Sequence, residues 1–541
     1  MSAYRTPAPR NEPVLNYAPG SPERAALKAA LARMSGETID IPVVIGGQEF
    51  RTGRTIDVVS PHEHRRILAK AHLADPALIA KAIDSATAAQ RDWAAMPFAD
   101  RAAVFLKAAD LLAGPWRQVI NAATMLGQSK TAYQAEIDSA CELIDFLRFN
   151  VHFAERLYEE QPISSPGIWN RMDHRPLEGF IYAITPFNFT AIAGNLPTTP
   201  AILGNVAIWK PAASALLSNW YVYKLLEAAG LPPGVINFVP GSAAQVSDLV
   251  LADRRLAGIH FTGSTEVFQS LWRTVGQNLP QYATYPRLVG ETGGKDFVLA
   301  HRSADVDALA VALVRGAFEY QGQKCSAASR AYVPDNLWPA VRERVVAMMA
   351  DIKMGDVADF RNFVGAVIDR KAYDKISEYV GTAGKAKGVE LVAGGKSDDS
   401  VGYFIEPTLL RADDPRYRTM CEEIFGPVLT LHVYPAAQWE ETLALVDNTS
   451  PYALTGAVFA QDRRVLSSAS EALRNAAGNF YLNDKPTGAV VGQQPFGGAR
   501  ASGTNDKAGS ILNLMRWISP RSIKETFDPP VKYRYPFMDA E

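Results

Sequence analysis

The chain has 541 residues, which is too long for one simple core, so we expect two or three domains. Hydrophobic residues make up 48% of it and charged residues 21%, an ordinary balance for a globular protein. The formal net charge of −2 gives no reason to expect nucleic-acid or membrane binding, and no apolar run approaches the roughly 20 residues that span a bilayer.

The cysteines and the N-terminal residues indicate in which cellular compartment the protein is expected. The three cysteines, at positions 141, 325 and 421, have no metal-ligand spacing and cannot form a disulfide framework, which favours a reducing environment without a metal site. The N-terminus lacks a secretory hydrophobic core, and its prolines make a poor transit helix. We expect a cytoplasmic protein, or one of the mitochondrial matrix if the chain is eukaryotic and processed.

The first 160 residues are predicted to be mainly helical. Residues 1–20 are polar and proline-rich and should lie on the surface, whereas residues 41–60 alternate like short strands. Helices are predicted to open at Ser21-Pro22 and Asp75-Pro76, and to cover residues 100–112 and 131–160.

From residue 179 the pattern changes to strands that alternate with helices. Apolar strands are predicted at residues 180–184, 205–209, 235–239 and 258–261. This alternation predicts a parallel, helix-covered sheet, which binds ligands at the carboxyl ends of its strands. The Gly-x-Gly-x-x-Gly fingerprint is absent after the first strand, which counts against an ordinary Rossmann site, and residues 262–265 are most simply a helix cap.

A second alternating region follows residue 325. Strands are predicted at 331–333, 427–433 and 480–483, with helices near 337–352 and 370–386. Residues 287–297 read as a strand, a sharp turn and another strand. Residues 161–178, rich in proline, serine and glycine, are predicted to form a loop or an exposed hairpin.

Two of these stretches carry chemistry. Cys325 lies in Gly-Gln-Lys-Cys-Ser, where Lys324 could favour a thiolate that attacks carbonyls; the alternative is a small buried hydrophobe. Glu291 should sit exposed at the turn, as a general base or as a solvated carboxylate. Together they suggest that a thiolate adds to an aldehyde, hydride leaves, and a carboxylate activates water to hydrolyse the thioester.

These stretches resemble the aldehyde dehydrogenase superfamily. Gly-Glu-Thr-Gly-Gly-Lys (290–295) and Gly-Gln-Lys-Cys-Ser (322–326) match its motifs, and the match continues in further blocks between residues 185 and 506, among them Thr-Pro-Phe-Asn-Phe-Thr, Trp-Lys-Pro, Phe-Thr-Gly-Ser and Glu-Glu-Ile-Phe-Gly-Pro. Within it, Asn-Glu-Pro-Val-Leu (11–15) and Val-Gly-Gln-Gln-Pro-Phe (491–496) are similar to the branch that oxidises glutamate γ-semialdehyde.

The resemblance implies an α/β fold in three parts. These are a variant Rossmann NAD-binding domain at 1–160 and 179–290, an α/β catalytic domain at 291–490, and a small β oligomerisation flap at 161–178 and 510–541. In the superfamily, residues 161–178 form a projecting hairpin, and the segment with Tyr533 and Tyr535 resembles a terminal strand that pairs within the oligomer.

The resemblance also assigns residues to the reaction. Besides Cys325 and Glu291, the side-chain amide of Asn188 is implied to build the oxyanion hole with the cysteine N–H. The implied cofactor-binding residues are Thr185, Pro186, Phe187, Lys210, Gly263, Ser264, Glu423 and Phe425. The implied substrate-binding residues are Glu142, Phe189, Ser326, Gly488, Ala489 and Phe496. No metal is implied.

Each of these residues also has an ordinary structural interpretation. From the residues alone, Asn188 could hold a turn, Lys210 could face solvent, and the aromatic residues could be core. Glu142 lies between the members of an apolar stripe in its helix. Its sequence context favours the interpretation as a solvated carboxylate. The chain also departs from relatives: Ala213 replaces a glutamate common in NAD-selective members, which leaves NADP open, and Ala489 replaces a frequent serine.

The resemblance therefore predicts NAD-dependent oxidation of L-glutamate γ-semialdehyde to L-glutamate in proline catabolism. The alternatives are another short or acidic aldehyde, or a non-catalytic structural protein on the same fold. We expect a homodimer or higher homo-oligomer that binds a small-molecule substrate, with a separate proline dehydrogenase as a further partner, and neither nucleic acid nor membrane.

Overall fold

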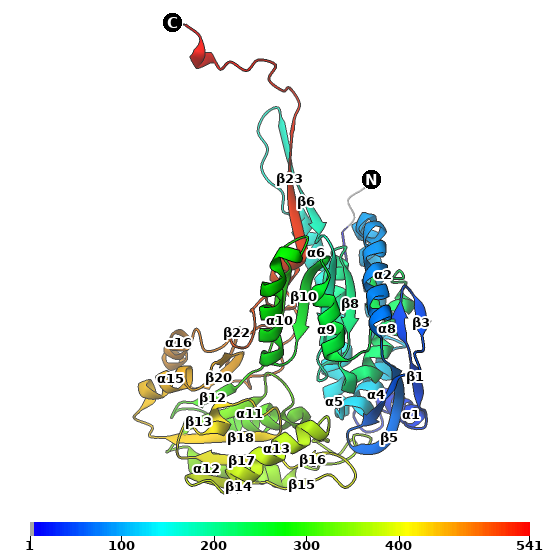
Figure 1. Cartoon of the computed structure of the whole chain (residues 1–541). Coiled ribbons are helices and arrows are strands. Elements are labelled where there is room, and N and C mark those ends of the chain that lie inside the picture. Colours follow the sequence, from blue (N-terminus) through cyan, green and yellow to red (C-terminus); the bar gives the residue numbers. More distant parts are fainter. Residues whose placement is uncertain (1–4, 541) are drawn as a thin grey trace.

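Two seven-stranded sheets organise the chain, which the computed structural model describes over residues 5–540 (Figure 1). The first sheet has the order β11-β10-β7-β8-β9-β2-β3 and the second the order β14-β17-β18-β13-β12-β20-β21. No helix within residues 5–540 is both long and apolar enough to cross a membrane.

The first sheet is parallel across five adjacent strands, as predicted. These are β7 (Phe180–Ile184), β8 (Val206–Lys210), β9 (Ile236–Phe238), β10 (Leu256–Thr262) and β11 (Arg287–Glu291). Two short antiparallel strands, β2 (Val43–Ile45) and β3 (Gln48–Phe50), extend one edge. The connecting helices, which cover the sheet, are α7 (Thr190–Ile202), α8 (Leu216–Ala229), α9 (Ala243–Ala252) and α10 (Thr265–Asn278).

The helices of the first 160 residues pack around this sheet. Ser21 and Asp75 cap α1 (Pro22–Ser35) and α2 (Pro76–Ala95), each accepting a hydrogen bond from a backbone N–H three residues on, which confirms both predicted starts. The others are α3 (Phe98–Ala113), α4 (Arg117–Gln128), α5 (Ala132–Ala135) and α6 (Glu142–Glu159). A small sheet of β1 (Ile39–Ile41), β5 (Glu63–His72) and β4 (Thr55–Ser60) lies beside them.

The prediction of one regular helix over 131–160 is wrong at one turn. Residues Glu136–Cys141 form a π-helical turn between α5 and α6. Such turns are frequent at functional sites. This one carries two buried carboxylates, Glu136 and Asp138, whose ion-pair partners Arg117 and Lys130 come from the preceding helix and loop.

The second sheet belongs to the C-terminal half. It is parallel except at one edge pair, and it consists of β14 (Val389–Ala393), β17 (Thr408–Ala412), β18 (Val428–Tyr434), β13 (Ala328–Pro334), β12 (Asp296–Ala300), β20 (Thr455–Phe459) and β21 (Asn479–Leu482). Helices α11 (Val306–Phe318), α12 (Trp338–Asp351) and α13 (Arg370–Ala383) connect strands of this sheet. The strands and helices predicted after residue 325 are therefore confirmed.

The segment between β11 and β12 crosses from one sheet to the other. Both predicted strands exist, but β11 ends the first sheet and β12 lies inside the second. The turn at residues 292–295 is therefore the link between the two sheets, and the ends of strands from both meet there.

A long two-stranded ribbon projects from the body (Figure 1). The hairpin implied within 161–178 is wrong, because β6 (Ile168–Pro176) pairs along its whole length with the distant β23 (Ile518–Thr526). The terminal strand also ends before Tyr533 and Tyr535, which lie exposed in the tail beyond it.

Candidate active site

A cavity of about 790 Å³ opens beside the link between the sheets. Its lining brings together Cys325 and all six predicted substrate-binding residues, which come from positions as distant as 142 and 496. Asn188 and Glu291, and the predicted cofactor-binding residues, lie outside this lining.

Cys325 follows a strained turn at the entrance to β13. Tyr320, Gln321 and Gly322 are all left-handed, with φ of 50°, 53° and 65°. For residues with a side chain this conformation costs free energy and persists only where the surroundings enforce it. The buried Gln321 amide does so: its Nε2 donates to the carbonyls of Ser129 (3.0 Å) and Ala366 (2.7 Å).

The Cys325 thiol is held in its neutral form. Burial raises its pKa far above the ordinary value, and the nearby carboxylates Asp296, Glu423 and Glu291 raise it further. The prediction that Lys324 favours ionisation is wrong, because the Lys324 ammonium contacts Gln134 and lies 3.2 Å from Asp138 instead. These surroundings therefore favour the thiol over the thiolate.

Asn188 is tied to the same turn. Its side chain is buried and its Nδ2 donates to the carbonyl of Gln323, two residues before Cys325, at 3.0 Å. An asparagine amide has two N–H donors, so a second one remains for another acceptor. This is the donor that an oxyanion hole requires.

Glu291 is not at an exposed turn, and that prediction is wrong. It pairs with Gly503 in an isolated bridge, and its carboxylate accepts a hydrogen bond from the Gly498 N–H at 2.8 Å. Burial raises its pKa well above the ordinary value. A half-buried carboxylate with a raised pKa is suited to act as a general base near neutral pH.

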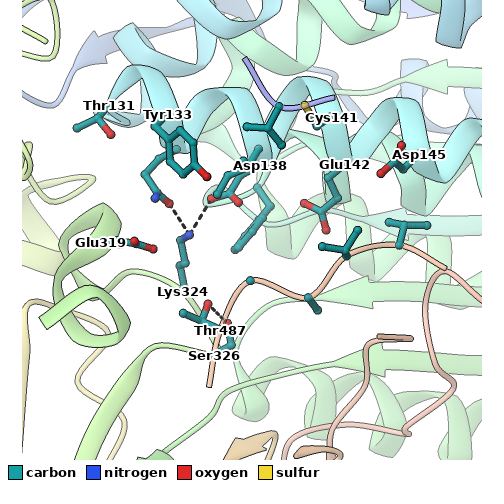
Figure 2. A pocket seen from close by; sticks show the side chains of 18 of the residues that line it. Thr131, Tyr133, Asp138, Cys141, Glu142, Asp145, Glu319, Lys324, Ser326 and Thr487 are labelled. Atoms are coloured by element: carbon teal, nitrogen blue, oxygen red, sulfur yellow. Dashed lines mark hydrogen bonds and ion pairs between the residues drawn. The ribbon is translucent and has the colours of Figure 1, made fainter. Parts of the chain in front are cut away.

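The predicted substrate residues surround the cavity. The Ser326 hydroxyl lies 2.8 Å from the hydroxyl of Thr487, a residue that sequence reasoning missed, and Gly488 and Ala489 follow it (Figure 2). The interpretation of Glu142 as a solvated carboxylate is wrong: it points into the cavity, and burial raises its pKa well above the ordinary value.

Sequence reasoning also missed a buried charge cluster at one end of the cavity. The Lys130 ammonium lies 2.6 Å from the Asp138 carboxylate. It also makes cation–π contacts, with its nitrogen 4.4 Å from the ring centre of Phe189 and 4.3 Å from that of Tyr320. Burial lowers its pKa to about 8. The Lys324 ammonium lies 3.2 Å from the same Asp138 oxygen (Figure 2). No sequence signal marks this cluster, because the π-helical turn brings Asp138 to the lysines.

The predicted cofactor residues lie at the carboxyl ends of the first sheet. Lys210 ends β8 and is buried, and burial alone lowers its pKa. Ser264 caps α10, accepting from the Val267 N–H, so the helix N-terminus starts at this edge. Thr185 follows β7 and accepts a hydrogen bond from the Trp209 indole at 3.0 Å.

Two further predicted cofactor residues, Glu423 and Phe425, come from the loop that precedes β18 of the second sheet. The Glu423 carboxylate accepts from the Gly294 N–H at 2.9 Å, and the rings of Phe187 and Phe425 are 5.8 Å apart. Lys210 has no carboxylate partner among residues 5–540. A buried ammonium of this kind, a helix N-terminus and a carboxylate beside glycine backbone suit the ribose and phosphate groups of a dinucleotide. Within residues 5–540, no group of three or more His, Cys, Asp or Glu residues could hold a metal ion.

Comparisons with known proteins agree with this geometry. Residues 49–523 match the model of the aldehyde dehydrogenase family. Relatives named delta-1-pyrroline-5-carboxylate dehydrogenase, mitochondrial, are 53% identical: that of Dictyostelium discoideum covers 98% of this chain and 96% of its own, and that of Bos taurus 98% and 94%.

Solved structures are similar over the whole chain. The delta-pyrroline-5-carboxylate dehydrogenase of Mycobacterium tuberculosis bound with NAD is 57% identical, with a TM-score of 0.96 and full coverage of both chains. A Thermus thermophilus 1-pyrroline-5-carboxylate dehydrogenase is 33% identical with a TM-score of 0.89, covering 97% of this chain and 100% of its own. The predicted α/β fold is confirmed, and the chain belongs to the aldehyde dehydrogenase family.

Proposed function

We propose that the chain oxidises L-glutamate γ-semialdehyde, the open form of Δ1-pyrroline-5-carboxylate, to L-glutamate, with NAD as the electron acceptor, in proline degradation. Relatives of that name at 53% identity over nearly the whole chain, and a solved one with NAD, support this function. The observation that carries the proposal is that Cys325 shares one cavity with the hydroxyls of Ser326 and Thr487 and the backbone at residues 488–489.

The first chemical step belongs to Cys325. Its sulfur adds to the aldehyde carbon as the thiol loses its proton, and the carbonyl oxygen gains negative charge. The free N–H of Asn188 and the backbone N–H of Cys325 stabilise that charge. NAD, when bound, accepts the hydride that leaves this carbon, so that a thioester to Cys325 remains.

The second step belongs to Glu291. As a base it takes a proton from water, and the hydroxide attacks the thioester carbon and releases the acid and the thiol. Its hydrogen bond from Gly498 fixes the carboxylate, and its raised pKa makes it basic enough for this task.

The same cavity selects the substrate. The Ser326 hydroxyl and the N–H groups of Gly488 and Ala489 bind its carboxylate, and Phe189 and Phe496 wall the passage to the sulfur. Charge-assisted hydrogen bonds of this kind are stronger than neutral ones, so an aldehyde without the carboxylate binds less well.

Cofactor binding belongs to the edge of the first sheet. Lys210 holds the adenosine ribose, Gly263 and Ser264 lie against the pyrophosphate, and Glu423 holds the nicotinamide ribose beside Phe425. Thr185, Pro186 and Phe187 complete this surface. We keep the division into a cofactor domain, a catalytic domain and a flap as part of the proposal.

The chain functions as a homodimer or higher homo-oligomer in a reducing compartment, the cytoplasm or the mitochondrial matrix. The projecting β6–β23 ribbon and the exposed aromatic tail support self-association, and the three free thiols suit such a compartment. A separate proline-oxidising chain supplies the semialdehyde. A structure titled proline utilization A from Bdellovibrio bacteriovorus is 29% identical, matching 96% of this chain and 53% of its own.

Formation of NADH with an aldehyde panel tests the function. The expected result is rapid turnover of the semialdehyde and a much lower kcat/KM for propanal and other plain aldehydes. A higher kcat/KM for another aldehyde, or equal values across the panel, would contradict the proposed substrate. No turnover of any aldehyde would indicate a structural protein.

A further inference from the structure

The loop of residues 488–494 carries half of the proposed carboxylate site. It presents the backbone of Gly488 and Ala489 to the cavity, and it belongs to no helix or strand. Its internal hydrogen bonds run from Val490 to Gln493 and Gln494, which close a tight turn. A loop without a strand partner holds its position only through contacts with other parts of the chain.

The hydrogen bonds from this loop to other segments converge on one residue of the N-terminal arm. The Val491 carbonyl accepts from Asn11 Nδ2 at 2.8 Å, and Gln493 Nε2 donates to Asn11 Oδ1 at 2.9 Å. Within the described part of the chain, these are the two hydrogen bonds that join residues 488–494 to residues outside the loop. Asn11 is separated from them by 480 residues or more in the sequence.

Asn11 is itself fixed to helix α6. Its Nδ2 also donates to Asp145 Oδ2 at 2.7 Å, so both amide hydrogens are used, and the neighbouring Glu12 N–H donates to Asp145 Oδ1 at 2.7 Å. Asp145 is buried. The Asn11 amide has only one favourable orientation, because a flip would place its oxygen against the Asp145 and Val491 oxygens.

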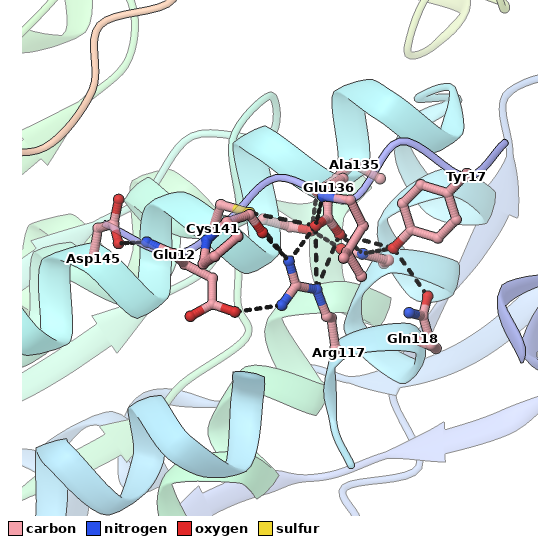
Figure 3. A network of polar contacts seen from close by, with 12 residues as sticks. Glu12, Tyr17, Arg117, Gln118, Ala135, Glu136, Cys141 and Asp145 are labelled. Carbon is pink, nitrogen blue, oxygen red and sulfur yellow. Dashed lines mark hydrogen bonds and ion pairs between the residues drawn. The ribbon is translucent and has the colours of Figure 1, made fainter. Parts of the chain in front are cut away.

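The next residues bind the arm to the helices more firmly (Figure 3). The Glu12 carboxylate bridges Arg117 at 2.6 Å and Arg148 at 2.8 Å. Arg117 in turn pairs with the buried Glu136, whose carboxylate also accepts from the Leu15 N–H at 2.9 Å. Buried, hydrogen-bonded ion pairs of this kind fix a single geometry, so Asn11 is a rigid support for the loop.

We infer that Asn11 is a positioning residue for substrate recognition. Its hydrogen bonds to Val491 and Gln493 hold the loop in the position where the N–H groups of Gly488 and Ala489 can bind the substrate carboxylate. This rests on the proposed function. It gives the Asn-Glu-Pro-Val-Leu stretch of the arm a role in selectivity, and Asn11 lines the same cavity as Cys325, Gly488 and Ala489.

The test compares variants of the full-length chain with two aldehydes. Asn11→Ala removes both bonds to the loop, and Asn11→Asp keeps the size but places acceptors against Val491 and Asp145. Gln493→Ala removes one bond only. The matched control is Thr6→Ala, which removes a hydrogen bond from the same arm to Glu155 on α6 and leaves the loop untouched.

We expect Asn11→Ala to raise KM for the semialdehyde about tenfold, since lost hydrogen bonds of ordinary strength correspond to factors of this size. The inhibition constant of glutamate against propanal oxidation should rise by a similar factor. Asn11→Asp should have a larger effect and Gln493→Ala one of about threefold, whereas Thr6→Ala should match the wild type. Values of kcat, and kcat/KM for propanal, should stay within about twofold for all four.

Hydrogen–deuterium exchange provides a readout that does not depend on activity. Peptides covering residues 488–494 should exchange faster in Asn11→Ala than in the wild type or in Thr6→Ala. Equal changes for both aldehydes, or no change in KM and in exchange, would overturn the inference. If the wild type neither oxidises the semialdehyde nor binds glutamate, the proposed function falls, and faster or unchanged exchange still decides whether Asn11 holds the loop.

Discussion

Gly294 lies where the two sheets meet, and replacing it by alanine should displace the nucleophile. A Cβ at this position would lie 2.6 Å from Asp296 Oδ2 and closer still to the carbonyl oxygen of Cys325. The Asp296 side chain can yield, but the second atom belongs to the backbone of Cys325 itself, in the segment between the strained turn and β13. The turn would have to move by about 1 Å to restore an ordinary van der Waals contact.

A displacement of that size at a reacting group can lower a rate by about a hundredfold. We therefore expect Gly294→Ala to lower kcat about a hundredfold for the semialdehyde and for propanal alike. Steady-state NADH formation measures this, and the melting temperature shows whether the variant is folded.

The matched control is Gly276→Ala, on the exposed face of α10. Nothing lies within 4 Å of its Cβ, so this change should leave kcat unchanged and stabilise the helix by about 0.5–1 kcal/mol. If folded Gly294→Ala retained the wild-type kcat, the tight packing of this residue against the Cys325 carbonyl could not be what positions the sulfur.

Three further predictions concern separate parts of the molecule. Glu291→Gln should give a burst of about one NADH per active site and then slow turnover; in the wild type kcat should fall as the pH drops through the raised pKa of Glu291, above 4.5, because the protonated acid is no base, and the variant should lose this dependence. Equal slowing of both phases would contradict this role. Ala489→Ser adds one donor and should tighten glutamate binding by at most about tenfold, whereas Ser326→Ala should weaken it, and propanal kinetics should change in neither; parallel changes for both aldehydes would show that the carboxylate binds elsewhere. Arg117→Met leaves the fully buried Glu136 without its ion pair and should lower the free energy of unfolding by about 3 kcal/mol in urea denaturation, with partial recovery on adding Glu136→Gln; wild-type stability would contradict a buried pair.

Local sequence patterns predicted most elements correctly. Helix caps at Ser21 and Asp75 and the apolar strands of both sheets follow from propensity and spacing, which depend on near neighbours. Partners distant in sequence were not predictable in this way. The pairing of β6 with β23 joins segments more than 300 residues apart, and nothing in the composition of either strand specifies the other.

The errors at the site share this cause. Glu291 reads as exposed because it precedes a glycine-rich turn, and Glu142 because a helix carboxylate usually faces solvent. Residues 498 and 503 contact Glu291, and Glu142 faces a cavity that residues 487–494 also line. Lys324 adjoins Cys325 in sequence, but its ammonium lies 3.2 Å from Asp138, a residue that the tertiary fold brings there. The motifs therefore indicated which residues gather at the site, but their burial and charge state depend on the tertiary fold.

The central claim is that Cys325 carries the substrate as a thioester that Glu291 helps to hydrolyse. The direct measurement is mass spectrometry of Glu291→Gln after acid quenching of a reaction with NAD and the semialdehyde. The account predicts a glutamyl adduct on the peptide that contains Cys325, in an amount equal to the NADH burst, and none in a Cys325→Ala control. An unmodified Cys325 alongside the burst, or an adduct on Cys141 or Cys421 instead, would contradict it.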